Sequence, residues 1–181
     1  GRNRKIGIAA VAVVVILAAV GIFSLFGGGR GPEETAEKLF AAMIDEEPEA
    51  IVDLLPQSMV ETAIEQDGYS KAELAKELDE MVRHLDSSFS NLATALIYQN
   101  VLGDGTELSY NVLDSESVSS NHLKSLQEQY SRLDVDISAA RMVDVELHLQ
   151  NDNKDFDESM TFHVPVIKVG SSWYLNLLRL G

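Results

Sequence analysis

The chain has no cysteine, only four histidines and few basic residues. Without cysteine there can be no disulfide framework, thiol nucleophile, cysteine-ligated metal centre or lipid attached to cysteine. The 14 lysine and arginine residues face 29 acidic ones, a net charge of −15. This charge excludes nucleic acid as a partner, because phosphates would be repelled. Hydrophobic residues make up 45% of the 181 and charged residues 24%, a composition typical of a globular protein.

Several signatures of enzymes are missing as well. There is no GxSxG, no HExxH, no phosphate-binding glycine loop and no Asn-x-Ser/Thr site for glycosylation. We therefore assign no catalytic residue, no metal ligand and no cofactor-binding residue, and we expect no cofactor. The sequence favours a protein that is not an enzyme but leaves the question open.

An uninterrupted apolar run covers residues 6–26. It holds no charge, and Ser24 is its only polar side chain. A helix of this length spans about 30 Å, the thickness of a bilayer core, so we predict a transmembrane helix. The basic flank, residues 1–5, carries Arg2, Arg4 and Lys5, which places this end in the cytoplasm and the rest of the chain outside the cell membrane. A cleaved signal peptide is the alternative, although its apolar run would be about 7–15 residues.

The charge changes sign after this segment. Arg30 is the last basic residue of the first 32, and residues 33–181 carry the remaining 10 basic residues against all 29 acidic ones, a net charge of −19. We predict a flexible glycine-rich linker at residues 27–32, because glycine imposes little backbone preference. Residues 33–181 then form one extracytoplasmic domain.

Helical periodicity fills the first half of this domain. Apolar residues recur at spacings of three and four over 33–45, 49–55, 57–66 and 70–85. Ser70 and Glu73 have the spacing of a capping box at the start of the last of these helices. We interpret the acidic residues of 33–49 as the solvent face of the helices.

Strand signals fill the second half. We predict a strand over 89–102 that pairs, through a tight turn at 103–105, with a strand over 107–112. A helix follows over 120–133. Three further strands present inward rows of apolar residues, namely Val143, Val145, Leu147 and Leu149, then Met160, Phe162, Val164 and Val166, then Trp173, Leu175 and Leu177. Strands joined by short turns are antiparallel. The fold class is therefore α+β, a curved antiparallel sheet packed on a layer of helices.

Two stretches carry a family resemblance. The segment PEETAEKLFAAMIDEEPEAIVDLL, together with the late run VPVIKVGSSWYLN, resembles the NTF2-like, cystatin-related α+β superfamily. It is most similar to uncharacterised membrane-anchored members from Gram-positive bacteria. The resemblance covers residues 33–181 and implies a cone between sheet and helices. In enzymes of the superfamily this cone holds acid and base groups, whereas the inward rows here are apolar.

Aromatic residues supply the candidate ligand pocket. Tyr98, Tyr110, Tyr130 and Trp173 could line it, and the alternative is that they belong to the core. His148 and His163 lie on outward rows and would need Asp144 or Glu146 to hold zinc, so we favour solvated histidines. We interpret the acidic stretch 151–158 as a hairpin turn in preference to a calcium loop.

These observations give a first function hypothesis. The chain is a single-pass, membrane-anchored, non-catalytic module that binds a protein, a peptide or a cell-wall component outside the membrane. The alternative is a small-molecule enzyme or ligand-binding pocket within the cone. A sensor or scaffold with a further cytoplasmic part is a third hypothesis.

Overall fold

The computed structural model describes residues 29–84 and 87–178. Five helices come first, α2 (Pro32–Ile44), α3 (Glu49–Val52), α4 (Gln57–Glu65), α5 (Lys71–Arg83) and α6 (Ser87–Leu102). They are followed by β1 (Glu107–Ser117), α7 (Ser120–Ser131), β2 (Ala139–Asn151), the 3₁₀ turn η1 (Asp152–Lys154), β3 (Phe156–Val169) and β4 (Ser172–Leu175). The predicted α+β class is confirmed.

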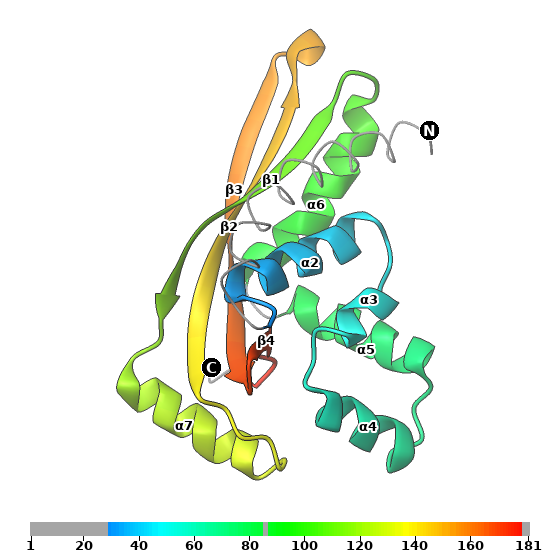
Figure 1. Ribbon diagram of the computed structural model, residues 1–181. Helices are drawn as coiled ribbons and strands as arrows, with labels where there is room; N and C mark the ends of the chain where they lie inside the picture. Colours follow the sequence, from blue (N-terminus) through cyan, green and yellow to red (C-terminus); the bar gives the residue numbers. More distant parts are fainter. Residues whose placement is uncertain (1–28, 85–86, 179–181) are drawn as a thin grey trace.

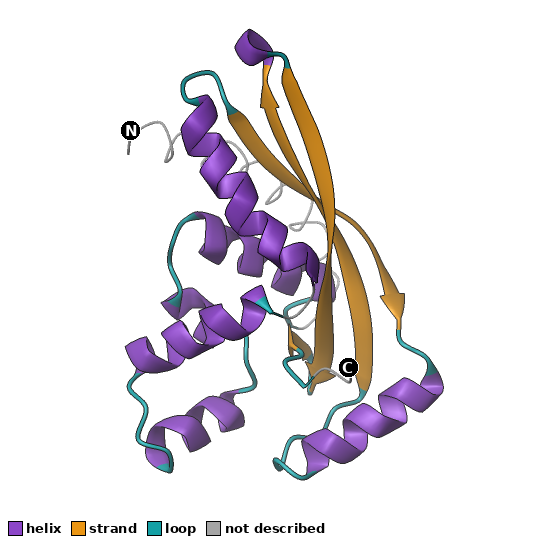
Figure 2. Cartoon of the chain, turned by 180° about the vertical axis from the view of Figure 1, so that it is seen from behind, coloured by secondary structure: helices purple, strands orange, loops and turns teal. Residues whose placement is uncertain are grey.

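The four strands form one antiparallel sheet in the order β1-β2-β3-β4. The sheet is long and twisted, with α2 to α6 on one side and α7 near its lower end (Figures 1 and 2). The predicted inward rows are confirmed for β2 and β3, because Val145 pairs with Phe162 and both are fully buried. Leu39 and Phe40 of α2 pack on this face, and the Phe40 ring meets the Phe162 ring edge-on at 5.3 Å.

The opposite face of the sheet carries a second, smaller core. Leu126 and Tyr130 of α7 pack there against Ala140 of β2 and Ile167 of β3. The Tyr130 hydroxyl donates a hydrogen bond to Asn176 Oδ1 at 2.8 Å. The helix predicted over 120–133 is thus confirmed, and it covers one end of the face of the sheet opposite the main core.

The prediction of a strand over 89–102 is wrong, because this segment is part of helix α6. Its alternation was incomplete, since Leu96 and Tyr98 occupied the row that should have been polar. The helical spacing is the true one: Ala95 and Gln99 are buried and Leu102 packs on the main core. Strand β1 therefore pairs with β2, and α7 lies in the connection between the two strands. Leu108 lies opposite Leu149.

Local signals at two turns are confirmed. The Ser70 hydroxyl accepts a hydrogen bond from the Glu73 backbone N–H at 3.1 Å and lies 3.0 Å from its carboxylate, which caps α5. The turn between β2 and β3 is held by Asn151, whose buried amide donates to the Thr106 hydroxyl at 2.8 Å. This bond ties the turn to the connection between α6 and β1.

No helix within 29–84 and 87–178 is long and apolar enough to cross a membrane. The predicted span at 6–26 lies outside the described residues, as does the basic flank at 1–5.

Candidate functional site

The candidate site is built around Arg30, which sequence analysis assigned to a flexible linker. Gly29 and Arg30 lie against the start of β4. The Trp173 backbone N–H donates to the Arg30 carbonyl at 2.9 Å, and the Arg30 backbone N–H donates to the Ser172 hydroxyl at 3.3 Å. A Cβ added to Gly29 would lie 2.2 Å from the Ser171 carbonyl oxygen, so only glycine permits this approach. Residues 29–31 are thus part of the domain.

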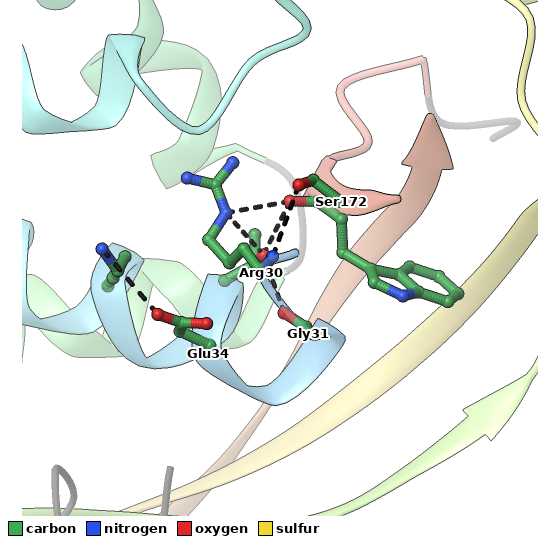
Figure 3. A network of polar contacts seen from close by, with 7 residues as sticks. Arg30, Gly31, Glu34 and Ser172 are labelled. Carbon is green, nitrogen blue, oxygen red and sulfur yellow. Dashed lines mark hydrogen bonds and ion pairs between the residues drawn. The ribbon is translucent and has the colours of Figure 1, made fainter. Parts of the chain in front are cut away.

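The Arg30 side chain is held from one side. Its Nε donates to the Thr35 hydroxyl at 3.2 Å and to the Trp173 carbonyl at 3.0 Å. Its guanidinium carbon lies 5.0 Å from the centre of the Tyr174 ring, a cation–π distance. Figure 3 shows Arg30 between the start of α2 and Ser172 of β4. These contacts fix the guanidinium through Nε and the Tyr174 ring.

One terminal nitrogen of the guanidinium has no partner. Arg30 Nη2 is buried and makes no hydrogen bond. Burial lowers the pKa of Arg30 below its usual value, and the charges of Tyr174 and Glu34 partly offset the effect. The guanidinium still keeps its positive charge, because arginine is not deprotonated in proteins. A buried charged donor without a partner is costly, and an anion would relieve that cost.

Two hollows meet at Arg30. The larger has a volume of about 420 Å³, within the range of small-molecule sites. Its lining comes from the start of the domain, from α3 to α5 and from β4, and consists of Arg30, Val52, Asp53, Leu55, Gln57, Val60, Lys71, Ser172 and Tyr174. The smaller, about 220 Å³, shares Arg30 and Asp53 with it and lies along α2. We call the larger hollow the Arg30 pocket.

The pocket forms because Pro56 and one backbone hydrogen bond fix the segments around it. Pro56 separates α3 from α4, so that the chain turns between them. The Leu175 backbone N–H donates to the Leu54 carbonyl at 2.7 Å, which holds the end of α3 against β4. At the mouth, Lys71 Nζ lies 3.7 Å from Asp53 Oδ1, and both side chains are at least half exposed.

The four predicted pocket residues lie at different places. Tyr110 is buried in the main core against Phe40, whereas Tyr130 is buried in the second core on the other face of the sheet. Tyr98 is 45% exposed on α6, with its ring 5.8 Å from that of Phe156. Trp173 is partly buried and packs on the main core. None of the four side chains lines the Arg30 pocket, although the Trp173 backbone holds Arg30.

The two outward histidines are not brought together. His163 pairs with Asp144 at 2.6 Å and His148 with Asp157 at 2.5 Å. His163 lies opposite Asp144 in the sheet, and His148 lies opposite Ser159, four positions further along. Within the described part of the chain, no group of three histidine or acidic side chains has the arrangement of a metal site.

Apart from the Arg30 site, the polar side chains of Glu37 and Tyr110 are buried in the domain. Glu37 is only 3% exposed, so the interpretation of all acids in 33–49 as solvent-facing is wrong at this residue. Burial raises the pKa of Glu37. The Tyr110 hydroxyl is buried without a partner, and its pKa is raised by burial and by the charges of Glu37 and Asp45. Neither hollow described above includes Glu37 or Tyr110.

Sequence reasoning missed Arg30 because its neighbours are glycines, which indicate a spacer. The signal that pointed to it was weak: Arg30 is the only charged residue between Lys5 and Glu33. Comparison with known proteins adds nothing to this site, since no family model, no curated protein and no solved structure matches the chain.

Proposed function

We propose that the chain is a single-pass membrane protein whose extracytoplasmic domain is a non-catalytic binding module, with the Arg30 pocket as its binding site. The observation that carries the proposal is the guanidinium of Arg30, fixed through Nε and lacking a partner at Nη2, at the wall of a 420 Å³ hollow. A preorganised donor of this kind binds an anion with little cost in side-chain entropy.

The inner face of the sheet supports binding over catalysis. Val143, Val145 and Leu147 of β2 are at most 1% exposed, and α2 packs on them. This part of the predicted NTF2-like cone is filled by apolar side chains. General acid–base catalysis needs a titratable group within reach of a substrate.

The alternative function, an enzyme acting within the cone, has one observation in its favour. Glu37 of α2 and Tyr110 of β1 are both buried and have raised pKa values, as acid and base groups of active sites often do. This alternative requires the core to open around them, and it predicts a small molecule that binds there and loses affinity in Glu37→Gln.

The membrane topology is tested with single cysteines, because the chain has none of its own. We expect a cysteine replacing Lys154, exposed in η1, to react with a membrane-impermeant maleimide in intact cells. The matched variant Asn3→Cys, in the basic flank, should react only after lysis. The reverse pattern would overturn the orientation, and reaction of neither thiol in membranes, or release of the Lys154→Cys protein into the medium, would overturn the anchor.

A further inference from the structure

The charges of the Arg30 pocket differ from those of the rest of the domain. Arg30 and Lys71 are its two cations and Asp53 is its one acid, so the lining carries a net charge of +1. Residues 33–181 as a whole carry −19. A local positive charge in so acidic a domain attracts a ligand of opposite sign and is not a property of the surface in general.

We infer that the ligand of this pocket is a single carboxylate attached to a small apolar group. The inference rests on the proposed function and adds the chemical class of the ligand. A monoanion neutralises the lining, whereas a dianion such as a phosphate monoester would leave an excess negative charge beside Asp53.

The geometry of Arg30 favours a planar anion. Nε is occupied by Thr35 and by the Trp173 carbonyl, so a ligand would meet the guanidinium at its terminal nitrogens, and it would reach the buried Nη2 only after a small shift of the side chains around it. Two parallel N–H groups of a guanidinium match the two oxygens of a carboxylate, which gives a bidentate pair. The unpartnered Nη2 is one of these two nitrogens.

The rest of the lining suits an apolar group. Val52, Leu55 and Val60 contribute aliphatic side chains to the wall, and Gln57 and Ser172 add polar ones. Helix α4, which carries Val60, has no fully buried residue of its own. Val60 and Ala63 of α4 are only partly buried where they pack on the main core, so an apolar group in the pocket would increase the burial of Val60.

A small organic acid and the free C-terminus of a peptide share this chemistry. The probes that separate them are N-acetyl-L-leucine and a five-residue uncharged peptide ending in leucine, each compared with its C-terminal amide. The amides have nearly the same shape but no negative charge. Inorganic phosphate tests the competing anion. Binding is measured by titration calorimetry on the full chain in an uncharged detergent.

We expect at least one free acid to bind, and its amide to bind about tenfold more weakly or not at all, as loss of a charge-assisted hydrogen bond implies. Binding of the short acid indicates a small organic acid, and binding of the peptide alone indicates a C-terminus. Equal binding of acid and amide, tighter binding of phosphate, or binding of no probe would each overturn the carboxylate assignment. Phosphate binding that depends on Arg30 would leave the proposed binding site standing.

Variants keep the test independent of folding defects. Arg30→Gln should abolish binding but removes contacts that hold β4. Lys71→Gln, at the half-exposed mouth, should weaken binding about two- to fivefold with the fold intact. Asp53→Asn should strengthen it, because the competing carboxylate is gone. Lys76→Gln is the matched control, since Lys76 is exposed on the same helix but does not line the pocket. Equal effects of Lys71→Gln and Lys76→Gln would overturn the role of Lys71.

Discussion

Two buried tyrosines provide a test of the packing on both faces of the sheet. Tyr110 and Tyr130 are 2% and 1% exposed. The hydroxyl of Tyr110 has no partner, whereas that of Tyr130 donates to Asn176 Oδ1 at 2.8 Å. Replacing each by phenylalanine removes one oxygen and keeps the ring, so the two substitutions differ mainly in what that oxygen was bonded to.

The expected effects have opposite signs. A buried hydroxyl without a partner costs about 1–3 kcal/mol, and the small space left by its oxygen returns part of that. Tyr110→Phe should therefore raise the free energy of unfolding by about 1 kcal/mol. A typical hydrogen bond contributes about 0.5–1.5 kcal/mol net, so Tyr130→Phe should lower it by about 1 kcal/mol. The two variants should differ by about 2 kcal/mol.

Urea denaturation of residues 29–181, followed by circular dichroism, measures this difference. With a slope of about 1–3 kcal/mol per molar urea, the midpoints should be separated by about 1 M. Destabilisation by Tyr110→Phe equal to that by Tyr130→Phe would refute the reasoning, because it would mean that the Tyr110 hydroxyl has a hydrogen-bond partner in solution.

Three further predictions concern the same domain. The folded-state pKa of Glu37 lies above the ordinary 4.5, so the contribution of Glu37 to stability is full below about pH 4.5 and is lost as the pH rises through the folded-state value. Glu37→Gln should therefore stabilise the domain at pH 7 and have little effect at pH 4, as measured by urea unfolding at both pH values. A fragment of residues 33–181 should unfold at least about 2 kcal/mol more easily than residues 29–181, because it lacks the bonds of Arg30 to Ser172, Trp173 and Thr35; equal midpoints would contradict this. Trp173→Ala should cost about 3 kcal/mol, at the low end for a tryptophan because the side chain is only partly buried, and a loss below about 1 kcal/mol would place it in solvent.

The sequence predicted the elements whose periodicity is sustained. Strand β2 alternates between Val143 and Leu149 without a break, and its apolar row is buried throughout. The helix over 120–133 was predicted from its own apolar spacing, but the sequence does not say which face of the sheet it covers. That choice depends on Ala140 and Ile167, whose outward-facing side chains are apolar where α7 packs.

The segment 89–102 shows where local pattern fails. It has no charged residue, so neither face is marked as solvent-exposed, and both a strand and a helix fit the apolar positions. Tertiary packing favours the helix, in which Ile97 and Val101 are 61% and 71% exposed. The strand prediction places both of these β-branched residues on the buried row.

The candidate site was the least predictable part. Arg30 is placed by hydrogen bonds to residues more than 140 positions later in the chain, and a glycine-rich context gives no sign of such contacts. The burial of Glu37 was also missed, because an acidic residue in an acid-rich helix is normally solvent-exposed. Both residues depend on long-range packing, which composition and spacing do not encode.

The attachment of Gly29 and Arg30 to β4 has a mechanical consequence. Gly29 and Arg30 are the first described residues of the domain, and the same Arg30 forms a wall of the pocket. A pull on the chain ahead of Gly29 loads the bonds of Arg30 to Ser172 and Trp173 before it reaches α2. Tension would thus act on the pocket wall that carries the charge before it acts on the main core. If the Arg30 pocket binds a ligand as proposed, its occupancy and force on the N-terminal end of the domain would be coupled through Arg30.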